Sequence, residues 1–202
     1  MEVRPRDGDL NRSAVVDAAV ELLPEVGLDG LTLTGLAERL GVSQPAMYRH
    51  VDGVDDLWRE LGLEGRSRLA TTLGEAAMGR SRTEAVEATA HAWRRFATEN
   101  PDLYAATDRV PCAGDPGLEA AIERIVEILA ASLRGFDFDD ATTIDAAGTL
   151  RSALHGFVHL EIVDEHPAQH DNDAGFEAMI DLLCVGFDHL SEHGGAAQGG
   201  SR

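Results

Sequence analysis

Lysine is absent from the 202 residues, so the 17 basic side chains are all arginines, set against 36 acidic residues and giving a net charge of −19. The acidic excess runs along the whole chain: residues 1–62 hold six arginines and twelve acids (−6), and residues 63–202 hold eleven and twenty-four (−13). This balance argues against a broad electrostatic attraction to nucleic acid. Any phosphate contact must come from a few arginines, helix N-termini and neutral donors.

Long hydrophobic runs are also missing. No stretch of about 18 apolar residues occurs, which excludes a helical membrane span, and the opening residues include Arg4, Arg6 and Asp7 instead of an apolar signal segment. The two cysteines, Cys112 and Cys184, lack the spacing of metal or redox sites, so we expect each to be a buried or half-buried small apolar residue. We expect a cytoplasmic protein.

Apolar residues recur at three- and four-residue steps, the period of an amphipathic helix. The first such stretch predicts a helix over 12–26 whose buried face runs from Val15 to Val26, with Asn11 as its N-cap and Gly27 at its end. Further stretches predict helices at 54–78, 81–99, 118–133, 144–163 and 176–190, with a loop-rich segment from Pro101 to Gly117. The patterns predict an all-α fold.

A helix, a tight turn and a second helix are predicted within residues 34–50. Gly41 ends the first of them, Ser43 suits the N-cap of the second, and Pro45 suits its first turn, where a missing amide hydrogen is tolerated. A small apolar wedge fixes the angle between these helices, formed by Ala37, Val42 and Met47. The side chains left facing outward are Gln44, Ala46, Tyr48 and Arg49.

The stretch from Gly27 to Val51 reads Gly-Leu-Asp-Gly-Leu-Thr-Leu-Thr-Gly-Leu-Ala-Glu-Arg-Leu-Gly-Val-Ser-Gln-Pro-Ala-Met-Tyr-Arg-His-Val. It resembles the helix-turn-helix of the tetracycline-repressor (TetR) family. The resemblance implies a DNA-binding domain over 1–62, with its reading helix at about 44–50, and a helical effector-binding and dimerisation domain over 63–193. The glycine-rich tail, 194–202, has no periodicity and is expected to be disordered.

A helix inserted in the major groove needs short side chains for close approach and a few long ones for base edges. Gln44 suits bidentate pairing with adenine, Pro45 and Ala46 suit thymine methyl groups, and Arg49 suits guanine or a phosphate. The other predicted DNA-contacting residues are Thr32, Thr34, Ser43, Tyr48 and His50.

Two alternatives and two departures from the family pattern bear on this surface. Tyr48 has the alternative of packing against the first helix, and His50 that of capping a helix. Val54 stands where many relatives place a phosphate-contacting lysine, and Thr34 stands where relatives often have a basic base-reading residue. We therefore expect an operator different from the tetracycline one. Arg4 and Arg6 are candidates for a flexible arm on the DNA backbone.

The segment from Leu150 to Glu161 resembles the His-Gly helix of one group of family C-terminal domains. Gly156 costs this helix about 1 kcal/mol relative to alanine, which the close approach of a partner protomer would explain. The resemblance implies a homodimer that presents two reading helices to a palindromic operator.

Effector-binding candidates come from the segments that the resemblance assigns to the ligand pocket. They are Trp93, Phe96, Tyr104, Cys112, Leu154 and His155. Ordinary core packing is the alternative for each. His155 and His159 stand four residues apart, as do His166 and His170, a spacing compatible with a metal. No cysteine or nearby carboxylate completes a set, so we predict no metal and no cofactor.

The sequence thus predicts a ligand-responsive transcriptional repressor that binds double-stranded DNA as a homodimer and is released by a small-molecule effector. One alternative is a helical metal-binding enzyme, which requires Glu-x-x-His pairs that the chain does not have. Nucleophilic and nucleotide-binding motifs are also missing, so we predict no enzyme. The other alternative is a family member that has lost DNA binding.

Overall fold

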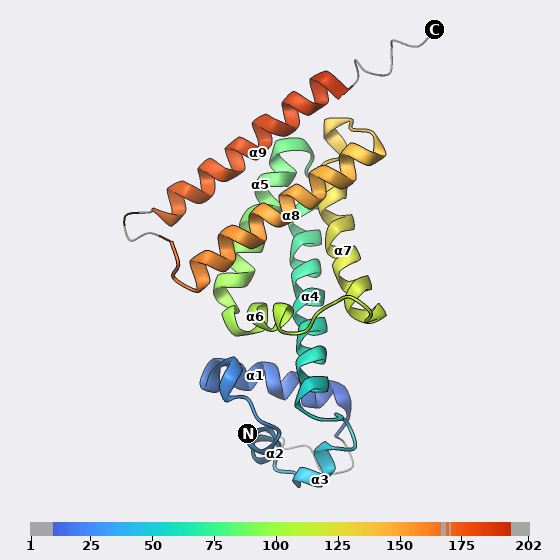
Figure 1. Ribbon diagram of the computed structural model, residues 1–202, viewed down its shortest axis with the longest axis vertical. Helices are drawn as coiled ribbons and strands as arrows, with labels where there is room; N and C mark the ends of the chain where they lie inside the picture. The colour runs from blue at the N-terminus through green and yellow to red at the C-terminus, as the bar shows by residue number, and fades with distance from the viewer. Residues whose placement is uncertain (1–9, 167–168, 170, 195–202) are drawn as a thin grey trace. The chain divides into compact units, whose positions relative to one another are not determined.

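The computed structural model describes residues 10–166, 169 and 171–194. Within these ranges every regular element is helical (Figure 1), which confirms the predicted all-α fold. No helix among the residues described is both long enough and apolar enough to cross a membrane. The elements are α1 (Arg12–Gly30), α2 (Leu33–Leu40), α3 (Gln44–Met47), α4 (Val54–Ala77), α5 (Arg82–Glu99), α6 (Pro101–Arg109), α7 (Pro116–Ser132), η1 (Arg134–Phe136), α8 (Asp140–Ile162) and α9 (Asn172–Gly194).

The chain forms two compact units that do not follow chain order. The first unit comprises Met1–Arg68 and Asn100–Ala121, and the second comprises Leu69–Glu99 and Ile122–Arg202. This grouping differs from the division predicted at residue 62, because α6 and the segment after it pack with the helices of the first unit.

Helix α1 begins as predicted. The Asn11 side chain accepts a hydrogen bond from the Ala14 N–H at 2.9 Å, which satisfies one of the free amides of the first turn. Regular geometry breaks at Gly27, whose φ of 70° glycine adopts without strain. Val26 is 40% exposed, so its predicted place on the buried face is wrong. It lies in the last turn before the break, where the packed face of the helix has ended.

Helix α6 lies where the sequence predicts a loop. Pro101 occupies its first turn, a position that proline tolerates, so this residue starts α6 as well as following the end of α5. Asp102 joins α6 to α1, because its Oδ1 accepts a hydrogen bond from the Leu28 N–H at 3.1 Å. The helix has nine residues, too few for the apolar period to stand out from its surroundings.

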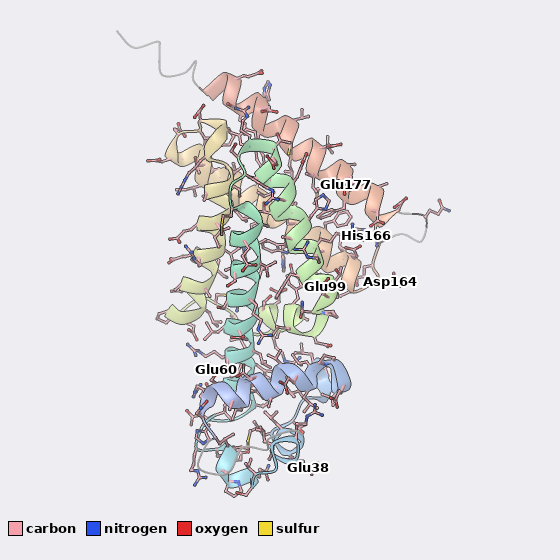
Figure 2. The ribbon with its side chains drawn as sticks, turned by 180° about the vertical axis from the view of Figure 1, so that it is seen from behind. Glu38, Glu60, Glu99, Asp164, His166 and Glu177 are labelled. Carbon is pink, nitrogen blue, oxygen red and sulfur yellow. The ribbon has the colours of Figure 1, made fainter. Side chains whose placement is uncertain are left out.

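Helices α5, α8 and α9 pack together in the second unit. The face of α5 predicted to pack is buried, namely Val86, Ala90, Trp93 and Ala97. Arg94 on α5 donates to Glu161 on α8 at 2.5 Å and to Asp173 on α9 at 2.7 Å. Figure 2 labels Glu177 of α9, whose Oε1 lies 3.5 Å from His91 Nε2. Ion pairs thus reinforce the apolar packing between these helices.

The last two helices begin earlier than their apolar patterns indicate. Helix α8 starts at Asp140 instead of Ile144, capped by Asp139, which accepts from the Thr142 N–H at 2.8 Å. Helix α9 starts at Asn172 instead of Phe176. Their first turns contain no large apolar residue, so periodicity does not detect them. Helix α9 continues to Gly194, and the rest of the predicted tail, 195–202, lies outside the described residues.

Candidate nucleic-acid interface

Helices α2 and α3 form the predicted helix-turn-helix. The Thr32 hydroxyl caps α2 by accepting a hydrogen bond from the Gly35 N–H at 3.1 Å. Gly41 ends α2 in the left-handed conformation, with φ of 70°. The predicted wedge is inward: Ala37 and Met47 are buried, and Val42 is half-buried.

Helix α3 is shorter than the predicted reading helix. Regular helix covers Gln44–Met47, and residues 48–50 form a turn. Ser43 stands at the N-cap position, but its hydroxyl makes no capping hydrogen bond. Pro45 lies in the first turn, as predicted.

The side chains around α3 form an exposed row. Gln44, Pro45 and Arg49 are exposed, and Tyr48 is 53% exposed. Tyr48 is therefore not buried against the first helix. His50 is half-buried, and its ring makes no hydrogen bond within the described part of the chain, so helix capping by His50 has no support.

Ala46 departs from this row. It is 2% exposed, so the prediction that it faces outward is wrong. In a helix, positions 44, 45 and 48 share one side, and positions 46 and 47 turn toward the other. Ala46 therefore packs with Met47 on the buried side of α3, where no groove can reach it.

A hydrogen bond that the sequence does not indicate joins α2 to α3. Gln44 Nε2 donates to Thr34 Oγ1 at 3.1 Å, across ten residues of chain. Both side chains are exposed. Residue types alone give no signal for this contact, because Gln44 and Thr34 each suit several partners.

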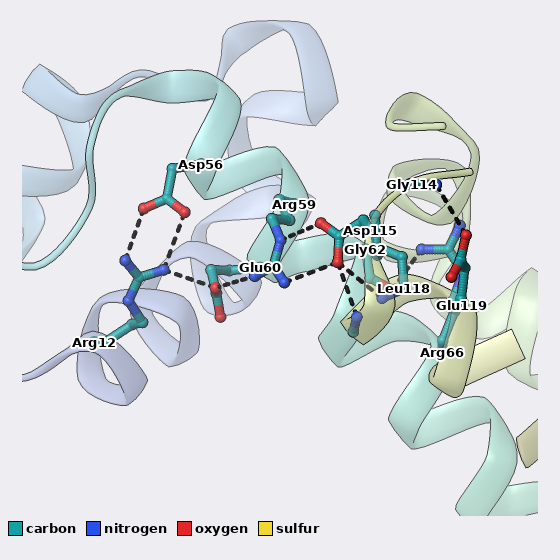
Figure 3. Close-up of polar contacts among 11 residues, drawn as sticks. Arg12, Asp56, Arg59, Glu60, Gly62, Arg66, Gly114, Asp115, Leu118 and Glu119 are labelled. Atoms are coloured by element: carbon teal, nitrogen blue, oxygen red, sulfur yellow. Dashed lines mark hydrogen bonds and ion pairs between the residues drawn. The ribbon is translucent and has the colours of Figure 1, made fainter. Parts of the chain in front are cut away.

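Ion pairs engage two arginines of the first unit (Figure 3). Arg12 donates to Asp56 at 2.9 Å and to Glu60 at 2.7 Å. Arg59 donates to Glu60 at 3.0 Å and makes two hydrogen bonds to Asp115. The Arg59 guanidinium lowers the pKa of the Asp115 carboxyl to about 2. These contacts tie the start of α1 to α4, and α4 to the start of α7.

Arg49 differs from the other arginines of the helix-turn-helix region. Arg39 pairs with Glu25 at 2.9 Å, whereas Arg49 has no carboxylate at ion-pair distance among the residues described. The predicted arm residues, Arg4 and Arg6, lie outside the described residues. Arg49 is thus the described arginine of residues 10–62 whose charge is available to a ligand.

The start of α4 is better balanced in charge than its sequence indicates. Burial alone would raise the pKa of Asp56, but hydrogen bonds from Arg12 and from the Asp52 N–H outweigh it and lower that pKa. Asp56 is therefore a paired anion. Val54 is 42% exposed and Asp55 is exposed, so an uncharged and an acidic side chain face solvent at the start of α4.

The predicted effector residues are divided between the two units. In the second unit Trp93, Phe96 and Leu154 are buried and His155 is half-buried. In the first unit Tyr104 is buried and Cys112 is half-buried. Cys184 is buried, so both cysteines have the predicted environment.

A cavity of about 930 Å³ opens in the second unit, and its lining comes from the ends of α4 and α7 and the start of α8. Arg124, Arg134 and Asp137 line it, together with Met78 and Phe138. None of the six predicted effector residues does, so that set stays a prediction.

The histidines predicted at four-residue spacing do not form a larger cluster. The His155 and His159 rings stack with centroids 6.0 Å apart. Within the described residues, no group of three or more His, Cys, Asp or Glu is arranged to hold a metal ion. His170 lies outside those residues.

Helices α8 and α9 lie side by side (Figure 1), and both expose large apolar side chains. Ile144, Leu182 and Val185 are 64%, 74% and 68% exposed. A groove of about 360 Å³ is lined by residues of both helices, including Thr142, Leu182 and Leu190. Three glycines of these helices have open space where a Cβ would lie, namely Gly148, Gly156 and Gly186.

Known proteins share both parts of this architecture. Residues 15–61 match the family described as bacterial regulatory proteins, tetR family, and residues 86–183 match the tetracyclin repressor-like C-terminal domain. The uncharacterised HTH-type transcriptional regulator Rv0681 of Mycobacterium tuberculosis is 35% identical over 196 residues, which cover 95% of this chain and 88% of that protein. The class D tetracycline repressor of Escherichia coli is 51% identical over 55 residues, which cover 27% of this chain and 25% of the repressor.

A solved structure has the same fold. A TetR variant from Acinetobacter baumannii, crystallised in complex with minocycline, aligns with a TM-score of 0.67 at 26% identity. The alignment covers 90% of this chain and 98% of that one. With an exposed helix-turn-helix at one end of the sequence and a matching C-terminal domain after it, the chain belongs to the TetR family of transcriptional regulators.

Proposed function

We propose that the protein is a ligand-responsive repressor that binds a palindromic operator as a homodimer and is released by a small-molecule effector. The exposed row of Gln44, Pro45, Tyr48 and Arg49 is the observation on which this proposal depends. The row combines an amide, a hydroxyl and an available cation on a short helix and the turn that follows it, and these groups can read base edges and hold phosphates.

The residues of this surface have different proposed roles. Gln44 pairs with adenine, Pro45 contacts a thymine methyl group, and Arg49 reads guanine or holds a phosphate. Phosphate hydrogen bonds come from hydroxyl and imidazole groups at the two helix starts and the turn, namely Thr32, Ser43, Tyr48 and His50. Thr34 takes part by holding the Gln44 amide through a hydrogen bond.

Selection from random duplexes tests DNA reading directly. The full chain should enrich a palindrome whose half-sites include adenine. Gln44→Ala should weaken binding to it by about 1 to 3 kcal/mol and relax the preference at one position of each half-site. Arg49→Gln should weaken binding, whereas Arg95→Gln, which removes an exposed arginine of the second unit, should not. If no sequence is enriched, the chain is a family member without DNA binding.

The homodimer is supported by the face of α8 and α9. Leu182 and Val185 expose most of their side chains to water, and burying such surface is favourable by roughly 25 cal/mol per Å². The missing Cβ atoms at Gly148, Gly156 and Gly186 leave room for another helix to approach closely. A second copy fits, because a two-fold axis brings the same face from each protomer together.

Charge substitution on this face tests the dimer. Leu182→Glu and Val185→Glu should each shift the protein to monomer in sedimentation equilibrium and abolish binding to the full palindrome. Met78→Glu is the control, because Met78 is an apolar residue that is 73% exposed but follows the end of α4 and belongs to neither α8 nor α9. A dimer that survives both substitutions contradicts the assignment.

Effector response is supported by the alignment with a TetR that was crystallised with minocycline. Trp93 provides a reporter for the predicted site: in Trp58→Phe it is the single tryptophan, since the chain has two. An effector should raise the thermal unfolding midpoint, release the operator and change Trp93 emission. A compound that releases the operator without changing that emission would place the effector site elsewhere.

A further inference from the structure

We infer that Thr34 sets the base preference of the helix-turn-helix by orienting the Gln44 amide, and that the preferred base is adenine. The inference rests on the proposed DNA-binding function and extends it to a residue that does not itself read the base. It starts from the 3.1 Å hydrogen bond between Gln44 Nε2 and Thr34 Oγ1.

The two partners stand on helices whose mutual position is fixed. Thr34 is the second residue of α2, within the first turn that Thr32 caps, and Gln44 is the first residue of α3. Buried Ala37 and Met47 hold these helices together. Thr34 therefore offers its oxygen from a rigid position, whereas a glutamine at an exposed position would otherwise sample many rotamers.

The contact decides which groups of the amide remain for DNA. A primary amide has one carbonyl acceptor and two N–H donors. Thr34 accepts one N–H, which leaves Gln44 with its carbonyl oxygen and one N–H. Neither group has another partner among the described residues, so both are available to a base.

One acceptor and one donor side by side match adenine. In the major groove adenine presents its N6 amino group as donor and its N7 as acceptor, whereas guanine presents two acceptors, N7 and O6. An amide turned the other way, with its oxygen toward Thr34, would offer two N–H donors and would suit guanine. In the structure the threonine hydroxyl accepts from the amide nitrogen, and this arrangement is the one that suits adenine.

Holding Gln44 before DNA arrives also strengthens binding. The rotamer entropy of a long side chain is lost on binding unless the free protein has already ordered it. Removal of the Thr34 hydroxyl should therefore lower affinity for the adenine site and leave affinity for unrelated duplexes unchanged.

The test uses the full chain and the palindrome obtained by selection. Gln44→Ala first identifies the base pair that Gln44 reads. Binding is then compared for adenine, 7-deazaadenine and guanine at that position. Wild-type protein should lose affinity with 7-deazaadenine, which has no N7 acceptor. Thr34→Val, which keeps the shape and removes the hydroxyl, should reduce the adenine-to-guanine preference by about three- to tenfold.

Three further variants separate positioning from a structural role. Thr34→Ser keeps the hydroxyl and should retain the preference to within about twofold. In the Gln44→Ala background, Thr34→Val should have no further effect, since its effect passes through Gln44. Thr98→Val, at an exposed threonine of α5 in the second unit, should change nothing. If Thr34→Val does not fold, Thr34→Ala replaces it, since alanine favours a helix.

A measurement without DNA gives a second readout. The side-chain NH₂ resonances of Gln44 in ¹⁵N spectra of the free protein should shift in Thr34→Val and stay in place in Thr98→Val. An unchanged Gln44 signal, or a wild-type adenine preference in Thr34→Val, overturns the inference and leaves the proposed function intact. Equal losses from Thr34→Val with and without Gln44 also overturn it, because Thr34 would then contact DNA by itself. Failure to select any duplex removes the proposed function and this inference together.

Discussion

Arg12, in the first turn of α1, donates to both carboxylate oxygens of Asp56, in the first turn of α4, at 3.1 and 2.9 Å. The pair joins two helix starts and keeps this guanidinium on the protein. Because the Arg12 side chain is 43% exposed, solvent screens the interaction, and its contribution to stability is modest.

Arg12→Gln should lower the free energy of unfolding by about 0.5 to 1 kcal/mol, since one guanidinium serves both Asp56 and Glu60. Urea denaturation at low salt measures this, and the difference should shrink in 1 M salt. Arg124→Gln is the control. Arg124 pairs with Glu127 at 3.3 Å, and the two side chains are 66% and 68% exposed, so the loss of this pair should be near zero. Equal losses from the two variants would contradict a special role for Arg12.

The salt dependence of operator binding should be shallow. Arg12, Arg39 and Arg59 are paired with carboxylates, which leaves Arg49 as the available cation of described residues 10–62. If Arg49 of each protomer holds one phosphate, the slope of log K against log[salt] should be about −2. Titration of the operator at several salt concentrations measures it. A slope near −10, typical of a strongly basic repressor, would mean that other cations contact the DNA.

The contribution of Asp115 to the stability of the fold should depend on pH. The Arg59 guanidinium lowers the pKa of Asp115 to about 2, from 3.8 without such a partner. Folding therefore favours the ionised form, so the contribution is complete above about pH 4 and is lost as the pH falls toward 2. Asp115→Asn should have a lower urea midpoint than wild type at pH 7, and the two midpoints should converge between pH 4 and 2. A constant gap across that range would exclude this carboxylate as its source.

Gly65 allows α4 and α6 to approach closely. A Cβ at this position would lie 2.9 Å from the Leu103 carbonyl oxygen and 2.9 Å from Thr107 Cγ2. Gly65→Ala should therefore destabilise the protein by about 1 to 3 kcal/mol, as overpacking does. Gly74→Ala, on the same helix, would meet only Ile128 Cδ1 at 3.9 Å and should be neutral or slightly stabilising. The thermal unfolding midpoints of the two variants test this prediction. An unchanged midpoint for Gly65→Ala would show that α6 can move away from α4.

Local patterns account for the parts of the fold that the sequence predicts. Asn11 and Thr32 cap their helices through contacts with residues three positions away, and Gly27 and Gly41 end or break helices through their own backbone freedom. These features depend on neighbours in the chain. For the same reason the exposed position of Gln44 follows from the turn before it.

Contacts between residues far apart in the chain could not be predicted from the sequence. The burial of Ala46 depends on which side of α3 faces the core, and α6 owes its place to contacts with α1, such as Asp102 with Leu28. The partners of Arg12 and Arg59 lie 44 and 56 residues further along the chain. Composition gives the number of arginines but does not show which of them form ion pairs with carboxylates. The hydrogen bond from Gln44 to Thr34 also depends on how α2 and α3 are placed relative to each other.

The placement of α6 bears on how the protein can be divided or recombined. The contacts of Asp102 with Leu28, of Arg109 with Asp29 and of Asp115 with Arg59 all connect residues 100–121 to residues before 68. A fragment that stops after the helix-turn-helix would lose every one of these partners. A chimera that exchanges the first 62 residues between two regulators would mismatch them. Transplanting DNA recognition intact would require two separate stretches of the donor sequence to be exchanged together.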